Sequence, residues 1–134
     1  MRKELEQRLV ERWPSWFNTG GDIRDTAMPR GFEHDDGWFD LIWRLCEYLE
    51  PLVAEFERAT ERQFEVLQVK EKFGGLRFYV NCRKEEAVRQ RIGTAAQESF
   101  HTCEICGQPG KLREDSWIKT LCDLHNTLEY RSVR

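Results

Sequence analysis

Four residues in the last third of the chain have the types and the spacing of a metal site. Two-residue gaps separate Cys103 from Cys106 and Cys122 from His125, and fifteen residues lie between the two pairs. Such short gaps let one turn aim both side chains of a pair at a single point, which suits a tetrahedral zinc ion. We therefore expect these four residues to bind one zinc ion, with His101 as the alternative fourth ligand. Because protein fills all four positions, none stays open for water or substrate, and the zinc is expected to be structural.

The segments that hold these ligands are expected to form a treble clef. Residues 103–107 are typical of a tight knuckle, and residues 111–120 predict a small hairpin. Residues 120–123 resemble a capping box that opens a helix. That helix would carry Cys122 and His125 three residues apart on one face.

Upstream of this tail, hydrophobic periodicity predicts three helices. The first spans residues 2–13 and the last spans residues 84–100, while a longer helix follows Asp36 and runs past Pro51. Because proline removes an amide donor, we expect a kink or a restart of the long helix there. Residues 17–31 show no sustained period and predict an irregular surface loop, a candidate binding element.

Residues 64–82 predict a β-hairpin with Gly74 and Gly75 as its two-residue turn. That turn would pair Phe73 with Leu76 on the face that packs on the core. The helix over residues 84–100 is expected to cover this face.

The opposite face of the hairpin would gather three cations and a tyrosine. We call it the outer face, and its candidate partner-binding residues are Lys70, Lys72, Arg77 and Tyr79. It could hold phosphates or an acidic partner, although a charged face also simply keeps a hairpin soluble. The alternation places Glu71 on the apolar side, where a carboxylate must lie at the sheet edge, pair with a cation or serve a function.

A second polar group consists of His34, Asp35 and Asp36, with Asp40 one turn further on. It could imitate a metal site or an acid and base pair. Capping of the long helix by Asp35 and Asp36 explains the aspartates without any chemistry.

Composition limits the class of protein. The chain has 134 residues, of which 40% are hydrophobic and 12% aromatic, enough for a core in a self-sufficient fold. We see no secretory signal, and no apolar run approaches the roughly 20 residues that span a bilayer, so no membrane association is expected. Five cysteines in a metal-type pattern fit a reducing compartment, and the expected location is the cytoplasm.

Charge is unevenly distributed along the chain. Residues 1–61 carry 8 Lys and Arg against 14 Asp and Glu, whereas residues 62–91 carry 8 against 4. This split disfavours indiscriminate binding to nucleic acid but permits a local anion-binding face. The order of elements predicts an α+β fold, with helices packed on a small antiparallel hairpin. It divides into a domain over residues 1–100 and a zinc module over residues 101–134.

Three motifs together resemble a group of small uncharacterised bacteriophage and prophage proteins. They are DGWFD at residues 36–40, QVKEKFGGLRFY at residues 68–79, and CEICGQPG at residues 103–110 with LCDLH at residues 121–125. The resemblance covers residues 36–126 and implies a phage accessory role without naming an activity. The expected treble clef also resembles the metal unit of HNH-type nucleases, but their additional His-Asn-His catalytic set is not found around it.

The leading hypothesis is a non-enzymatic phage or prophage protein in the host cytoplasm that binds a host macromolecule and blunts a bacterial defence system. Its partner would be a host or phage protein, held by the outer face with the loop over residues 17–31, or else by the zinc module around Trp117. One alternative is a nucleic-acid-binding regulator that uses the basic hairpin. Another is a metal-dependent nuclease that uses His34, Asp36, Asp40 or Glu71, which we call the acidic set.

Overall fold

A computed structural model describes residues 1–115 and 117–127. Within them, the helices are α1 (Lys3–Arg12), α2 (Phe39–Thr60) and α3 (Glu86–Ser99), with short 3-10 helices η1 (Met28–Arg30) and η2 (Asp36–Trp38). One sheet has the strand order β1 (Phe32–Glu33), β2 (Val66–Lys72), β3 (Gly75–Val80). A second sheet pairs β4 (Lys111–Arg113) with β5 (Lys119–Leu121). The chain is therefore a mixed α+β protein, as its sequence predicts.

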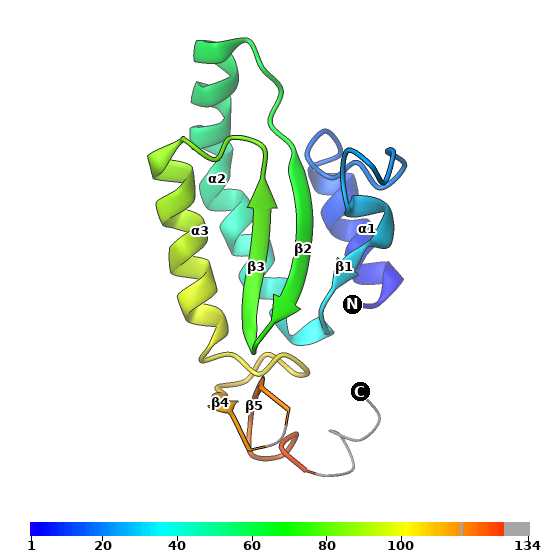
Figure 1. Cartoon of the computed structure of the whole chain (residues 1–134), viewed down its shortest axis with the longest axis vertical. Helices are drawn as coiled ribbons and strands as arrows, with labels where there is room; N and C mark the ends of the chain where they lie inside the picture. The colour runs from blue at the N-terminus through cyan, green and yellow to red at the C-terminus, as the bar shows by residue number, and fades with distance from the viewer. Residues whose placement is uncertain (116, 128–134) are drawn as a thin grey trace.

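Figure 1 shows how these elements are arranged around the three-stranded sheet. α2 runs behind the sheet, α3 lies along the β3 side, and α1 lies on the β1 side. The β4–β5 pair lies at the end of the sheet where the chain turns from β2 into β3. The metal-type residues are thus attached to one end of the main fold.

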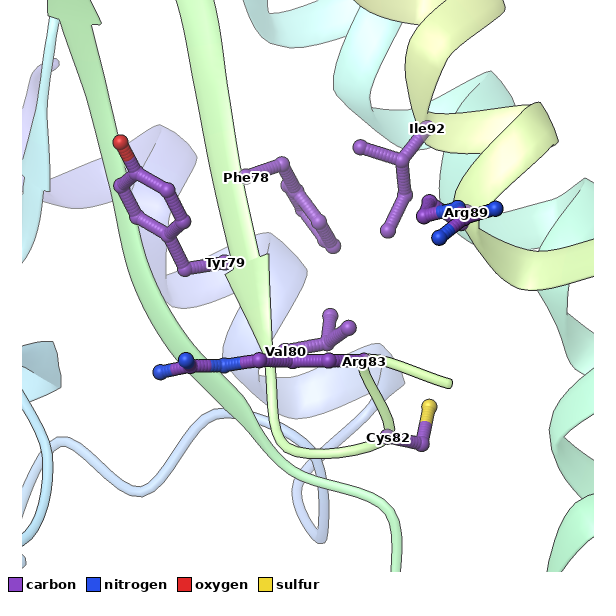
Figure 2. A pocket seen from close by; sticks show the side chains of 7 residues that line it. All are labelled: Phe78, Tyr79, Val80, Cys82, Arg83, Arg89 and Ile92. Carbon is purple, nitrogen blue, oxygen red and sulfur yellow. The ribbon is translucent and has the colours of Figure 1, made fainter. Parts of the chain in front are cut away.

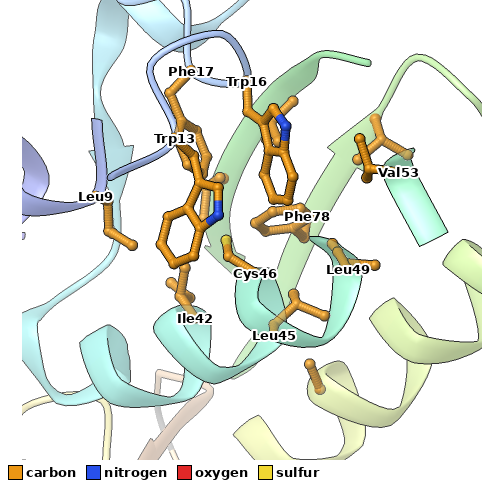
Figure 3. Close-up of a cluster of buried hydrophobic side chains, with 14 of the residues drawn as sticks. Leu9, Trp13, Trp16, Phe17, Ile42, Leu45, Cys46, Leu49, Val53 and Phe78 are labelled. Atoms are coloured by element: carbon orange, nitrogen blue, oxygen red, sulfur yellow. The ribbon is translucent and has the colours of Figure 1, made fainter. Parts of the chain in front are cut away.

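The apolar stripe of α2 forms the centre of the core. Residues 41, 42, 45, 46, 49, 53 and 56 of this helix are all buried, as the spacing of three and four residues predicts. Figure 3 shows α2 side chains from Ile42 to Val53 gathered with Trp13, Trp16 and Phe17 from the N-terminal segment and Phe78 from the sheet. Trp13 and Trp16 stack with ring centroids 5.7 Å apart, which adds to the burial of their large apolar surfaces.

Pro51 lies inside one uninterrupted helix, so the predicted restart of α2 does not occur. Both Pro51 and Glu47, whose carbonyl would otherwise accept the missing amide, are exposed. Water can therefore satisfy the freed carbonyl, and the loss of one hydrogen bond is tolerated on this face.

Residues 18–25 form the irregular, exposed loop that the sequence predicts, but both ends of the segment over residues 17–31 pack on the main fold. Phe17 and Met28 are buried, and the Ala27 N–H donates to the Leu67 carbonyl over 2.8 Å. Phe32 then pairs in parallel with Val69, which adds β1 to the sheet. A strand of two residues is too short to leave a period in the sequence, so β1 was not predicted.

The hairpin turn was predicted one residue too far along the chain. β2 ends at Lys72 and β3 begins at Gly75, so Phe73 and Gly74 form the turn, with φ of 53° and 83°. Phe73 is consequently exposed and does not pair with Leu76. Gly75 has another role, because a Cβ there would lie 2.5 Å from the Phe100 ring. One glycine serves the turn and the other serves close packing.

The actual register pairs Glu71 with Leu76 and Lys70 with Arg77. From Gln68 to Lys72 it differs from the predicted register by two residues, and a shift of two leaves these side chains on their predicted faces. A β-bulge between Val66 and Gln68 shifts the register further at the start of β2. The outer face is therefore as expected.

The tail contains the predicted small hairpin, β4 with β5, but no helix within the residues described. Residues 123–125 form a turn and residues 126–127 are not helical, and any continuation of the expected helix falls on residues outside those described. The division of the chain at residue 100 stays a prediction. In the described part of the chain, no helix has both the length and the apolar content needed to cross a membrane.

Candidate metal centre

The side chains of Cys103, Cys106, Cys122 and His125 converge on one point, and their ligand atoms all lie within 4.8 Å of one another. The Sγ atoms of Cys106 and Cys122 are 3.8 Å apart, and His125 Nδ1 lies 3.2 Å from the Cys122 Sγ and 3.7 Å from the Cys103 Sγ. A tetrahedral ion with bonds of about 2.0–2.3 Å separates its ligand atoms by about 3.3–3.8 Å. The group could therefore hold a metal ion, with Nδ1 as the histidine ligand.

Local hydrogen bonds fix the knuckle that carries the first two ligands. The Cys103 N–H donates to the Gln108 carbonyl over 2.8 Å, and the Gly107 N–H donates to the Cys103 carbonyl over 2.9 Å. Gly107 has a φ of 80°, a conformation in which glycine has no steric penalty. The predicted knuckle is therefore present, and its own backbone bonds fix the loop that carries both thiols.

β5 leads directly into the second pair of ligands. The Thr120 hydroxyl does not cap a following helix, as the sequence predicted, but donates to the Gly74 carbonyl over 2.6 Å. Arg113 donates to the Leu121 carbonyl and forms an ion pair with Asp123 at 2.8 Å. These bonds hold the residues on both sides of Cys122 in place.

The knuckle lies directly against the segment that precedes α2. The Gly37 N–H donates to the Glu104 carbonyl over 2.7 Å, and Trp38 Nε1 donates to the Thr102 carbonyl over 2.9 Å. A Cβ at Gly107 would lie 3.0 Å from the Gly37 carbonyl, so the two backbones approach closely. Residues 36–40 and 103–110 therefore meet at one junction.

A buried charged cluster completes this junction. Lys119 Nζ lies 2.9 Å from a Glu71 oxygen and 3.4 Å from a Glu104 oxygen. The second Glu71 oxygen accepts the Gly74 N–H over 2.7 Å, and the second Glu104 oxygen accepts the Asp35 N–H over 3.1 Å. Of the three alternatives predicted for Glu71, pairing with a cation is the one that the structure shows.

Glu104 was missed by sequence reasoning, although it is only 1% exposed. Burial raises the pKa of its carboxyl to about 7, while the charge of Lys119 opposes this rise and that of Glu71 adds to it. Its burial results from the contact with Gly37 and leaves no signal in the local sequence.

The predicted acidic set does not gather into a second site. Asp36 binds Arg2 through the backbone N–H and the guanidinium, each over 2.8 Å, so it caps α1 and not α2. Asp40 is exposed, and Glu71 is bound to Lys119. Within the described residues, the cysteine and histidine group is the one cluster of three or more metal-type side chains.

His34 lies in the core beside Phe32 and Trp38. Its Nδ1 is 2.8 Å from the Asp35 carbonyl, and its Nε2 is buried with no partner in the described part of the chain. Burial lowers its pKa to about 3, and the ammonium group of Met1 contributes to the lowering. His34 is therefore a neutral core residue.

The outer face carries cations that are not neutralised by ion pairs. Lys72, Arg77 and Tyr79 are exposed, and Lys70 is half-buried. The ion pairs found in the described ranges use none of these cations, and the neighbouring Glu33 is hydrogen-bonded to Gln68. The structure therefore groups the predicted partner-binding residues on one open surface.

The outer face and the preceding loop share a groove of about 440 Å³, which we call the loop groove. Residues 23–27 form one wall, and Gln68, Lys70, Tyr79 and Arg83 form much of the other. Asp25 is the acidic residue of this lining, and Ile23 is 49% exposed. Arg83 had not been predicted as part of this surface, because it follows the end of β3.

Comparison of the chain with protein-family models, with curated proteins and with solved structures finds no match. Its function must therefore be argued from its own side chains and their arrangement.

Proposed function

We propose that this chain is a small phage or prophage accessory protein that binds a host protein, with a structural zinc ion holding its C-terminal part. The observation that carries the proposal is the loop groove. It places an exposed hydrophobic side chain, Ile23, beside Lys70 of the outer face and beside Arg83. Interfaces commonly combine an apolar centre with a charged rim that selects the partner.

The zinc ion is the best occupant of the Cys103 group. Three thiolates and one imidazole in tetrahedral array are the donors typical of structural zinc sites. A knuckle followed by a hairpin and a second ligand pair supports a treble clef arrangement. With four protein ligands the ion would have no open position, so its contribution would be folding energy.

The phage setting rests on the resemblance carried by the three motifs, and inhibition of a bacterial defence system is the role we propose within it. An acidic host protein would be the preferred partner of the outer face, because unlike charges speed association and exclude wrong partners.

Two other functions would use the same residues differently. A nucleic-acid-binding regulator would place phosphates against the outer face, and its affinity would fall steeply with salt. A metal-dependent nuclease would use a divalent ion at residues such as Asp36, which here binds Arg2.

The test is affinity capture from nuclease-treated bacterial lysate with the tagged protein, followed by mass spectrometry. The variant Lys70→Glu/Arg77→Glu reverses two cations that face each other across the hairpin. The matched control Lys3→Glu/Arg58→Glu changes the net charge equally on exposed positions of α1 and α2.

We expect the outer-face variant to lose the partner and the control to retain it, with both keeping the wild-type metal content and melting temperature. Equal capture by both variants would contradict the proposed surface. Capture of a partner from untreated lysate but not from nuclease-treated lysate would favour the nucleic-acid regulator. Metal-dependent cleavage by the wild type, lost in Asp36→Ala, would favour the nuclease.

A further inference from the structure

β3 is an edge strand whose free side is only partly covered. In the three-stranded sheet it pairs with β2 alone, and α3 lies along its other side (Figure 1). Near the turn, α3 closes this edge, because the Leu76 N–H donates to the Ser99 hydroxyl over 2.9 Å. Further along β3 the helix provides no such partner.

The backbone groups of Phe78 and Val80 point to this free edge. Alternate residues of a strand direct their N–H and C=O groups to opposite sides. The Leu76 N–H points to α3, whereas the Asn81 N–H donates towards β2, to the Glu65 carbonyl over 3.0 Å. Phe78 and Val80 lie two and four residues after Leu76, so their backbone groups point to the same side as those of Leu76. Neither has a backbone hydrogen bond outside the β2–β3 pair in the described chain.

The same stretch of edge opens into a groove of about 470 Å³ between β3 and α3, which we call the edge groove. Figure 2 shows Phe78 and Val80 from β3 facing Ile92 from α3, with the Cys82 thiol at one end. This volume is within the range of about 300–1,000 Å³ that is usual for binding pockets. An unpaired strand edge beside an apolar groove is the arrangement that accepts an added β-strand.

Two arginines give the edge groove its charge. Arg89 stands on the α3 wall, and the side chain of Arg83 runs beside Tyr79 on the outer-face side of β3 (Figure 2). Neither forms an ion pair with another described residue, and the lining contains no acidic side chain. Glu85 and Glu86, at the start of α3, come before Arg89 in the sequence and are not part of the lining.

We propose that the edge groove binds an extended segment of a partner protein in which apolar and acidic residues alternate. The segment would continue the sheet beyond β3, and the backbone groups of Phe78 and Val80 would bind its main chain. Because side chains alternate along a strand, one set would enter the apolar groove beside Ile92 and the other would lie near Arg83. This inference rests on the proposed function in one respect, that the partner is a protein.

A second copy of this chain fits the edge less well. Pairing β3 with the same strand of another copy would gather the outward Arg77 and Arg83 side chains of both copies on one face. Like charges placed across neighbouring strands are destabilising. The acidic segment of a different protein has the complementary charge.

The test uses octapeptides that alternate valine with glutamate, together with zinc-loaded protein labelled with ¹⁵N. NMR titration should shift the amide signals of Phe78 and Val80, and hydrogen exchange at both amides should slow. A peptide that alternates valine with lysine should bind at least about tenfold more weakly.

Two variants probe the two halves of the proposal. Val80→Pro removes an edge N–H that is not part of the β2–β3 ladder, a position where proline is tolerated, and should weaken binding about tenfold. Arg83→Glu/Arg89→Glu leaves the backbone intact and should weaken binding of the acidic peptide but not of an uncharged serine-substituted one. Arg58→Glu on α2 is the control for charge.

The proposal is overturned if the acidic peptide causes no shift at millimolar concentration, or shifts the Lys70 and Lys72 amides while those of Phe78 and Val80 stay unchanged. Concentration-dependent dimerisation that protects the β3 amides would assign the edge to a second copy and would also overturn it. The peptides do not involve the cellular partner, so their failure to bind is distinguishable from failure of the lysate capture.

Discussion

Gly37 touches the backbone of Cys103, and no other residue would fit there. A Cβ at position 37 would lie 2.2 Å from the Cys103 carbonyl oxygen and 2.6 Å from the carbonyl carbon of Glu104. Backbone atoms on both sides cannot move aside as a flexible side chain can. This contact couples the candidate metal centre to the start of α2.

Gly37→Ala should therefore separate the knuckle from the rest of the fold. We expect a loss of roughly 1–3 kcal/mol in the free energy of unfolding, typical of overpacking at a closed site. The matched control is Gly93→Ala, which lies in α3 with open space around it and should gain up to about 1 kcal/mol. Denaturant unfolding of both variants measures the difference, and equal stabilities would show that the contact is not tight.

Glu71→Gln should destabilise the protein much more than Glu65→Gln. The Glu71 carboxylate accepts hydrogen bonds from Lys119 and from the Gly74 N–H, and its side chain is 15% exposed. An amide keeps one acceptor but loses the charge that pairs with Lys119, so we expect a cost of roughly 1–3 kcal/mol. Glu65 has no ion pair in the described chain, and its change should be nearly neutral. Equal melting temperatures for the two variants would show that Glu71 contributes no more to stability than Glu65 does.

The sequence predicted those features that local spacing determines. The α2 stripe, the knuckle and the outer face each follow from a repeat of two, three or four residues, and all three are present. The prediction that Glu71 lies on the apolar face of the hairpin was also correct, because the register was wrong by an even number of residues.

Features that depend on contacts distant in the chain were not predictable in the same way. Gly75 was assigned to the turn, but Phe100, which packs against it, is twenty-five residues away. Thr120 was assigned to a helix cap, but its hydroxyl binds the Gly74 carbonyl. In both cases a local rule predicted a reasonable role, but the residue has a different role that depends on a tertiary contact.

Purified protein should contain one zinc ion per chain. Cys122→Ser should lower the metal content and the melting temperature together, because a structural metal site contributes its binding energy to folding. Cys82→Ser is the matched control, since Cys82 lies outside the group and should leave the metal content unchanged. Elemental analysis under reducing conditions measures both. Absence of metal from freshly prepared wild type, or equal metal in Cys122→Ser, would contradict the site.

His34 should make the protein less stable as the pH falls below about 6.5. Burial lowers its pKa from 6.5 to about 3, so between these values the unfolded chain binds a proton that the folded chain does not. Stability rises with pH wherever the unfolded state binds more protons, so His34 contributes stability above pH 6.5 that is lost towards pH 3. Between pH 7.5 and pH 5.5 the expected loss is about 1.4 kcal/mol.

Other titrating groups near His34 change the stability with pH in the opposite direction, so the measurement must isolate the contribution of His34. The raised pKa of Glu104 means that its folded form binds the extra proton, which favours folding as the pH falls. Met1 and Asp36 also act on His34, through their charges. The variant His34→Asn keeps a donor for the Asp35 carbonyl but does not titrate. The unfolding free energy of wild type minus that of the variant, taken at each pH, therefore cancels the contribution of Glu104. The difference should shrink by about 1.4 kcal/mol from pH 7.5 to pH 5.5. Parallel pH profiles for the two proteins would mean that the fold does not lower the pKa of His34 from 6.5.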